Sequence, residues 1–203
     1  MFSLEEGESA VRLARTVIDA HIKGEKLEET PVPERFLKKG GAFVTLVTFP
    51  DGRLRGCIGY PIPLFAIKDT IIRSAKSASS EDYRFRPVRP AELDKITVEV
   101  SLLTIPEEII VKKRKDLLGE IVIGRDGLIV EKPKQRNKGL LLPQVAVDWG
   151  WNPREFLEEA CLKATLPANA WKDCEVRVYK FSATVFYELT PRGDVLQKEL
   201  SDD

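Results

Sequence analysis

The sequence predicts an α+β fold with a mainly antiparallel sheet flanked by helices. The first observation is the pair Asp51-Gly52, a strong two-residue hairpin signal between two runs rich in β-branched and aromatic residues. The second is that apolar residues recur at helical spacing in three longer segments. The third is the order of these elements, which does not alternate strictly as strand, helix and strand. A doubly wound parallel sheet is therefore not favoured.

The N-terminal half is predicted to contain two helices and one hairpin. Ser3 and Glu6 have the spacing of a capping box, which opens a helix that extends to about Ile22. After a charged loop, residues 42–49 form a strand and residues 53–59 return from the turn. The second helix covers residues 64–79.

The hairpin turn also predicts a register. In this register Leu46 faces Cys57 and Val44 faces Gly59 on one surface, while Thr45 and Ile58 lie on the other. Both surfaces are largely apolar, so we expect the hairpin to be central in the sheet and covered on each side. A shift of one residue would exchange every assignment.

The C-terminal half is predicted from weaker patterns. An alternating strand over residues 96–103 carries Glu99 and Ser101 on its polar face, either toward solvent or at the border of a cleft. Asn152 caps a helix that begins at Pro153. The polar tail after Pro191 is expected to fray. The remaining predictions are a hairpin from 121–124 to 128–131, a short helix over 143–147, and two strands at 176–181 and 184–189.

Length and composition limit the possible classes of protein. The 203 residues suffice for one domain with a sizeable core, or for one domain with two lobes. No apolar run approaches the roughly 20 residues that a membrane-spanning helix needs. Lys+Arg and Asp+Glu number 32 each, so no global field favours nucleic acid or an anionic membrane. High charge with few Asn, Gln, Met and His residues indicates a thermophilic source. The acids Glu5 and Glu6 argue against a secretory signal, and we expect a cytoplasmic protein.

Scarce cysteine and histidine exclude several chemistries. Cys57, Cys161 and Cys174 are too few and too scattered for a disulfide framework. His21 is the only histidine, so the usual zinc sites and the catalytic pairs that need a histidine base are not expected. No metal or cofactor is predicted. Cys161 lies on the apolar face of a predicted helix, which indicates a small core residue.

The strongest candidate site is the hexapeptide at residues 54–59. Cys57 is a candidate catalytic nucleophile, and Arg55, two residues away, is its candidate electrostatic activator. Gly56 and Gly59 would let backbone amides approach a ligand. In the alternative interpretation Cys57 packs against Leu46 as a small apolar residue, and the glycines only relieve crowding.

A second cluster follows the second predicted helix. Asp82 and Arg84 could orient a polar ligand, with Arg84 as an anion clamp held by Asp82. Alternatively, their salt bridge only fixes a loop and Phe85 enters the core. The basic runs at 112–115 and 132–138 could form a patch for RNA or an anionic partner, although nearby acids favour a solvated surface.

The hexapeptide Leu-Arg-Gly-Cys-Ile-Gly resembles the signature of the AMMECR domain family, which is named after a human chromosomal region linked to Alport syndrome. The resemblance covers most of the chain and implies a single AMMECR-type domain over residues 1–203. It extends through Asp82-x-Arg84-Phe85-x-Pro87, Glu92-Leu93, Val100-Ser101-Leu102-Leu103-Thr104, Gly127-Leu128-Ile129, Leu141-Leu142-Pro143-Gln144-Val145-Ala146 and Phe186-Tyr187-Glu188.

The resemblance implies an α+β domain with two unequal lobes around a cleft that the hexapeptide faces. It implies little about the reaction, because no biochemical activity is established for the family. Prokaryotic members often accompany Memo-like and radical-SAM proteins, which implies a shared pathway. Two departures affect access beside the hexapeptide: Tyr60-Pro61 follows where threonine is common, and Arg86 replaces a frequent proline.

Two functional hypotheses follow. In the first, the chain is a cytosolic small-molecule-binding protein or enzyme whose cleft is formed by the hexapeptide and completed by Asp82 and Arg84, and the pKa of Cys57 is depressed. In the second, it is a non-catalytic interaction module that docks a protein partner or RNA. A third possibility is a structural domain in which the hexapeptide serves only the fold.

Overall fold

The computed structural model describes residues 2–198, and its chain divides into two compact units. Among the described residues, the first unit contains those up to Ile105 and those from Thr184 to Lys198, and the second contains Pro106–Ala183. Strand β7 (Arg177–Glu188) contributes residues to both units. The description of residues 1–203 as a single domain stays a prediction.

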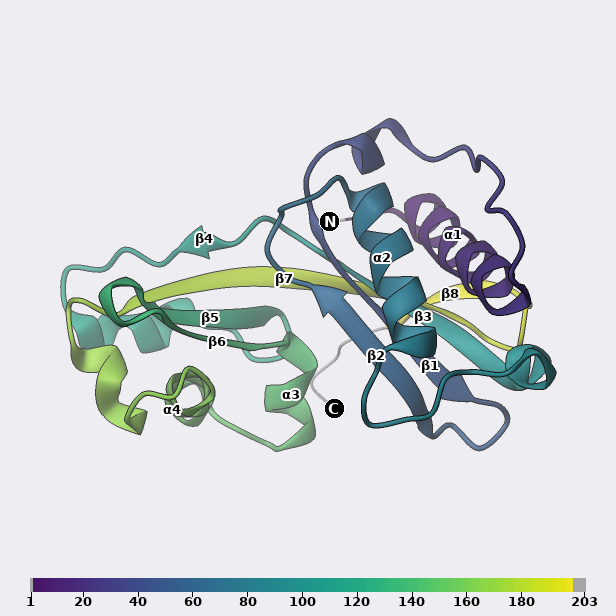
Figure 1. The fold of residues 1–203 in the computed structure, drawn as a ribbon. Coiled ribbons are helices and arrows are strands. Elements are labelled where there is room, and N and C mark those ends of the chain that lie inside the picture. The colour runs from purple at the N-terminus through teal and green to yellow at the C-terminus, as the bar shows by residue number, and fades with distance from the viewer. Residues whose placement is uncertain (1, 199–203) are drawn as a thin grey trace. The chain divides into compact units, whose positions relative to one another are not determined.

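The first unit is an antiparallel sheet covered by two long helices on one face. Strands β2, β1 and β3 are neighbours in this order, and the C-terminal part of β7 pairs with β8. Helix α2 packs on β1 and β2, and α1 packs on α2 and β3 (Figure 1). The bounds are α1 Leu4–Lys23, β1 Gly41–Thr48, β2 Leu54–Tyr60, α2 Ile67–Ser80, β3 Ile96–Leu103 and β8 Val195–Lys198, with 3₁₀ turns at Glu34–Leu37 and Pro90–Lys95.

The two faces of this sheet differ in burial. Val44 and Leu46 of β1 and Val98 of β3 are fully buried in the core beneath α1 and α2. The alternate residues of β1, such as Thr45 and Val47, are only half-buried. Alternation along the strands therefore separates an apolar helix face from a second, more polar face.

The second unit has its own sheet and its own core. Strand β5 pairs with both β6 and β7, and β4 pairs with β7, all antiparallel. Cys161 is fully buried in this core, as predicted. The bounds are β4 Glu107–Glu108, β5 Asp126–Lys132, β6 Asn137–Leu141, α3 Pro143–Asp148 and α4 Pro153–Lys163, with 3₁₀ turns at Arg114–Glu120, Pro133–Gln135 and Ala168–Lys172.

The predicted fold class and the starts of α1, α3 and α4 are confirmed, whereas α2 begins at Ile67, three residues later than predicted, because Ala66 forms a β-bridge with Lys39. The fold combines helices with a mainly antiparallel sheet. Ser3 and Glu6 form both hydrogen bonds of the capping box of α1, and Asn152 and Glu155 form those of α4. Within residues 2–198, no helix combines the length and the apolar composition that crossing a membrane requires.

The predicted hairpin register is wrong by one residue. Cys57 pairs with Thr45, and Leu46 pairs with Gly56. The Thr48 amide donates to the Arg53 carbonyl at 2.8 Å, so the turn is longer than predicted. The longer turn alone changes the register by two residues, which leaves each side chain on its predicted face. A β-bulge between Leu46 and Val47 then changes it by one and moves Cys57 to the other face.

Other strand predictions also need correction. Strand β2 is the last strand on its side of the sheet, not a central one. The two strands predicted near the C-terminus are one continuous β7, because no glycine or proline interrupts it. The second hairpin pairs β5 with β6, whereas residues 121–124 form a turn in which the Val122 amide donates to Asp126. Part of the tail expected to fray forms β8, which pairs with β7.

Candidate functional site

The β-bulge places Cys57 on the half-buried face of the first unit's sheet. Strand β1 passes directly from Val47, paired with Leu54, to Leu46, paired with Gly56, so Arg55 is the extra residue of β2. The Thr45 hydroxyl donates to the Cys57 Sγ at 3.3 Å. The alternative in which Cys57 packs against Leu46 is therefore wrong.

Asp82 and Arg84 hold the backbone of Cys57 at the edge of the sheet. The Cys57 amide donates to Asp82 Oδ2 at 2.9 Å, and Arg84 Nη2 donates to the Cys57 carbonyl at 3.2 Å. Arg84 also donates to both Asp82 oxygens, from Nε at 2.9 Å and from Nη2 at 2.7 Å. The carboxylate and guanidinium thus satisfy the backbone groups that a neighbouring strand would otherwise bind.

Asp82 is fixed by these contacts, since it is only 4% exposed. Hydrogen bonds from the Arg84 guanidinium and the Cys57 amide hold the pKa of its carboxyl far below the usual range. The side chain of Arg84 is 43% exposed. In the described part of the chain, Nη1 of Arg84 makes no hydrogen bond, so most of the guanidinium's donors already serve Asp82 and Cys57.

Arg55 is bound to an acid instead of to the thiol. Its Nε and Nη2 donate to the two oxygens of Glu92 at 2.9 and 3.2 Å. The positive charge that does act on the Cys57 thiol is that of Arg84. The proposed activation of Cys57 by Arg55 therefore lacks support in the geometry, and the ion pair instead fixes the bulge residue to the 3₁₀ turn that precedes β3.

Burial raises the pKa of the Cys57 thiol, and the nearby charges of Glu99 and Asp82 raise it further. The Thr45 hydrogen bond and the Arg84 charge oppose this effect without cancelling it. The predicted depressed pKa is wrong, chiefly because burial of the thiol disfavours the thiolate, and secondarily because two carboxyl groups lie near it. At neutral pH the neutral thiol is the dominant form.

Each glycine of the hexapeptide allows a close contact within the fold. A Cβ on Gly56 would lie 2.2 Å from the Ala78 carbonyl oxygen of α2. A Cβ on Gly59 would lie 2.3 Å from the ring of Phe43. These contacts account for both glycines through packing, and their predicted role in ligand binding stays a prediction.

Glu99 and Ser101 lie on the same face as Cys57. Glu99 pairs with Thr45, which pairs with Cys57, so the three residues form a row across three strands. Ser101 is 2% exposed and follows Glu99 at the spacing that keeps it on this face. The interpretation of these residues as a solvent-facing surface is wrong for Ser101.

Comparisons with known proteins agree with this fold and motif. The AMMECR1 family model matches residues 11–186. The chain belongs to the AMMECR1 family. Protein MJ0810 of Methanocaldococcus jannaschii is 48% identical over 98% of both chains. The crystal structure of the uncharacterized protein PH0010 from Pyrococcus horikoshii has a TM-score of 0.85 at 45% identity, and the match covers 96% of this chain and 97% of that one. These thermophilic archaeal relatives agree with the thermophilic source that the composition indicates.

Two residues that contact the hexapeptide, Thr45 and Glu92, were not predicted from the sequence. No contact between Thr45 and Cys57 was expected, because the predicted register placed Thr45 opposite Ile58 instead of opposite Cys57. Glu92 belongs to the matched Glu92-Leu93 motif, but only its ion pair with Arg55 reveals what it does. A bulge has no strong sequence signal of its own, although two glycines around an arginine in a strand are compatible with one.

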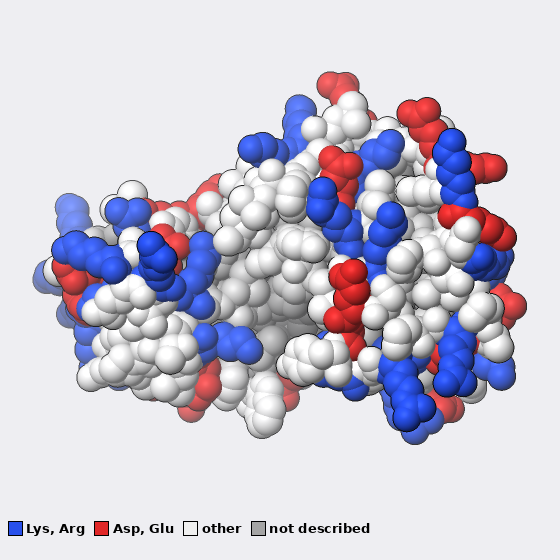
Figure 2. All heavy atoms as spheres, viewed as in Figure 1, with Lys and Arg blue, Asp and Glu red and all other residues white. Residues whose placement is uncertain are grey.

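The basic run at residues 132–138 is largely neutralised in this family member. Lys132 Nζ lies 2.8 Å from Asp173 Oδ2, and Lys138 Nζ lies 3.1 Å from Glu131 Oε2. Lys134 pairs with Glu175 at 2.5 Å. Figure 2 shows acidic atoms among the basic atoms over the part of the surface formed by β5, β6 and α4. This pairing weakens the case for an RNA-binding patch.

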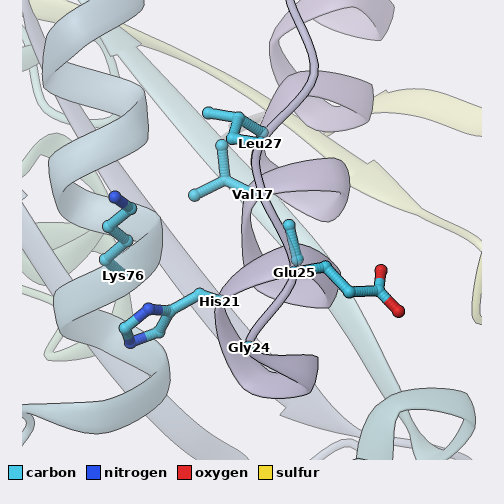
Figure 3. Close-up of a pocket in the computed structure, with 7 residues that line it drawn as sticks. Val17, His21, Gly24, Glu25, Leu27 and Lys76 are labelled. Carbon is cyan, nitrogen blue, oxygen red and sulfur yellow. The ribbon is translucent and has the colours of Figure 1, made fainter.

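His21 lies apart from the hexapeptide residues, as expected for a helix-terminal histidine. Its Nε2 is 3.0 Å from the Ser80 hydroxyl oxygen. Figure 3 shows it directed from α1 toward α2, where it and Lys76 line a surface pocket of about 240 Å³. No cluster of three or more potential metal-ligating side chains occurs among residues 2–198.

Proposed function

We propose that this AMMECR1-family chain is a cytosolic small-molecule-binding protein or enzyme whose site is the Cys57 face. We define the Cys57 face as the face of the β2-β1-β3 sheet that carries Thr45, Cys57, Glu99 and Ser101. The observation that carries the proposal is the bulge at Arg55. It turns the half-buried thiol of Cys57 toward this face. Bulges that redirect a side chain are common beside functional sites.

The surroundings of Cys57 support a preorganised site. Asp82 and Arg84 fix its amide and carbonyl, and Thr45 donates to its sulfur. A site held by a second layer of hydrogen bonds loses little freedom when a ligand binds. In this proposal Cys57 contacts the ligand, Thr45 orients the thiol, and Asp82 and Arg84 position the strand.

Cys57 stays a candidate nucleophile, but its raised pKa means that it is a neutral thiol before a substrate binds. A neutral thiol is a weak nucleophile, so catalysis would require a ligand or substrate that accepts its proton or excludes the nearby acids. Reversible contact with a ligand needs no thiolate. The binding role is therefore the primary proposal, and catalysis by Cys57 follows only if a bound substrate activates it.

The family resemblance supports a pathway context for this ligand. We propose the Memo-like and radical-SAM proteins that accompany prokaryotic members as pathway partners that would supply or consume it. The acids that pair with the lysines of the 132–138 run argue against RNA as the ligand of that surface.

The test compares ligand capture by two cysteine variants. The protein is incubated with the small-molecule fraction of an archaeal cell extract, desalted and analysed by mass spectrometry. We expect Cys57→Ser to retain about tenfold less of the captured compound than the wild type, a loss equal to about one good hydrogen bond or contact. Cys174→Ser, at an exposed cysteine of the second unit, serves as the matched control and should bind normally. Equal capture by Cys57→Ser, or no capture by any form, would contradict the proposal.

A further inference from the structure

The pocket beside His21 lies on the helix-covered side of the first unit's sheet, whereas the Cys57 face is the other side. Its volume is about 240 Å³, and α1, α2 and the segment after α1 all contribute to it (Figure 3). Pockets for drug-sized ligands measure roughly 300–1,000 Å³, so this one suits a smaller molecule. The lining residues are Val17, Ala20, His21, Gly24, Glu25, Leu27 and Lys76.

Part of the lining is apolar. Val17 and Ala20 of α1 are 1% and 8% exposed. Leu27, in the segment after α1, packs against the same core and lies beside Val17 (Figure 3). Because contact with apolar side chains favours apolar surface, a ligand that fills the pocket needs an apolar portion.

Two basic side chains complete the lining. The Lys76 carbonyl accepts hydrogen bonds from the hydroxyls of Ser79 and Ser80, but its ammonium forms no ion pair and no hydrogen bond within residues 2–198. Since the Ser80 hydroxyl donates to this carbonyl, its oxygen accepts from His21 Nε2 at 3.0 Å. This bond holds the His21 ring against α2 and leaves Nδ1 without a partner in the described part of the chain.

The acidic groups near the pocket limit the charge of an anionic ligand without excluding it. The Glu25 carboxylate points away from His21 and Lys76 (Figure 3). At the end of α1, the carbonyls of Ala20 and His21 accept from the amides of Glu25 and Gly24. A helix C-terminus disfavours a dianion more than a monoanion. One negative charge, as on a carboxylate, therefore fits this pocket better than the double charge of a phosphate.

We propose that this pocket binds a short aliphatic carboxylate, with the carboxylate at Lys76 and His21 and the aliphatic chain against Val17 and Leu27. The Lys76 ammonium supplies the charge and several donors, and the protonated His21 ring can donate from Nδ1. The site is separate from the Cys57 face and does not depend on the function proposed there. It gives a role to the only histidine of the chain.

The single histidine also supplies the measurement. The carbon-bound ring protons of His21 give NMR signals that report on this pocket without assignment of the other residues. Protein labelled with ¹³C in histidine is titrated at constant pH and ionic strength with butyrate, butylammonium and inorganic phosphate. The first two share an aliphatic chain and differ in the sign of their charge, whereas phosphate is an anion without a chain. We expect butyrate to shift the His21 signals to saturation, and the other two compounds to bind at least about tenfold more weakly.

Two lysine variants on the same helix test the position of the carboxylate. Lys76→Gln should weaken butyrate binding about tenfold, the effect of one lost hydrogen bond to a charged group. Lys68→Gln is the matched control, since Lys68 lies about two turns earlier in α2 and outside this lining. It should bind butyrate as the wild type does.

The wild-type titrations decide the ligand class even if a variant does not fold. His21 signals that do not respond to butyrate, or that respond equally to butylammonium or phosphate, would overturn the proposal. Equal affinities in Lys76→Gln and Lys68→Gln would overturn the placement of the carboxylate at Lys76. None of these results bears on ligand capture at Cys57, so the two proposals succeed or fail independently.

Discussion

The two faces of the first unit's sheet use polar groups in opposite ways. On the helix face, Arg15 of α1 forms an ion pair with Glu188 of β7, and both are almost fully buried. Arg15 also donates to the carbonyls of Leu93 and Ile96, and the Val98 amide donates to Glu188. Every strong donor and acceptor of this cluster has a partner within the protein.

On the Cys57 face, by contrast, the Glu99 side chain is 21% exposed and lies 4.0 Å from Lys198 Nζ, and Cys57 is half-buried. One face encloses its charges in a buried ion pair with several further hydrogen bonds, whereas the charged groups of the other face are partly exposed to solvent. Burial removes the solvent screening that weakens an exposed ion pair and makes the loss of one partner costly. The comparison teaches that the depth of a charged group, more than its presence, decides how strongly stability depends on it.

Breaking the buried ion pair on the helix face should have the largest effect. Arg15→Leu leaves the Glu188 carboxylate buried without its counter-ion, which we expect to reduce the free energy of unfolding by about 3–5 kcal/mol in urea denaturation. Arg12→Leu, on the same helix in an exposed pair with Glu8, should cost less than about 1 kcal/mol. The double variant Arg15→Leu/Glu188→Leu should recover part of the loss. Equal effects at Arg12 and Arg15 would contradict the difference between the faces.

Adjacent residues of β1 offer a second comparison. Leu46→Ala opens a cavity beneath α2 and should reduce the free energy of unfolding by about 2–5 kcal/mol. Val47→Ala, on the other face and half-buried, should cost about 1 kcal/mol. Both values come from the same urea titration. A larger loss at Val47 than at Leu46 would mean that the assignment of the faces is incorrect.

Asp82→Asn tests the attachment of β2 at its edge. Loss of the charged hydrogen bonds to Cys57 and Arg84 should reduce the free energy of unfolding by about 1–3 kcal/mol near pH 7. Because the folded-state pKa of Asp82 lies below its unfolded value of about 3.9, the stabilisation is present above that pH and is lost as the pH falls through the folded pKa. The difference between wild type and variant should therefore shrink in acid.

The matched control is Asp51→Asn, since Asp51-x-Arg53 repeats the spacing of Asp82-x-Arg84 at an exposed turn. Thermal melts of both variants between about pH 3 and pH 7 make the comparison. Asp51→Asn should change stability by less than about 1 kcal/mol. If the two variants behave alike at every pH, the Asp82 contacts add nothing beyond a surface ion pair.

The smallest effect is expected at Glu99, and with the opposite sign. Burial raises the folded-state pKa of Glu99 above its unfolded value of about 4.3, so the wild type loses stability as the pH rises through that window. Glu99→Gln removes this penalty and should increase the free energy of unfolding by up to about 1 kcal/mol near pH 7, with no gain below about pH 4. Denaturation at the two pH values measures it. A loss of stability at neutral pH would show that the Glu99 carboxylate is paired in solution.

Residue types and short spacings in the sequence predicted the site residues that lie close together in the chain. The hexapeptide, Asp82 and Arg84 could be selected from residue types and spacing, and the structure brings Cys57, Asp82 and Arg84 into direct contact. Their partners could not be selected in this way. Glu92 is 37 positions from Arg55 in the chain, and Glu188 is 173 from Arg15. Side-chain pairs at such separations leave no periodic signal in the sequence.

The sequence by itself determined the fold class, the starts of α1, α3 and α4 and the family, because caps, turns and motifs act within a few residues. Only the tertiary structure decided which face of the sheet carries Cys57. A strand alternates its side chains with a period of two, so the one extra residue at Arg55 exchanges the two faces while leaving the local pattern almost unchanged. That single residue determines whether the sulfur enters the core or lies beside Thr45 and Glu99.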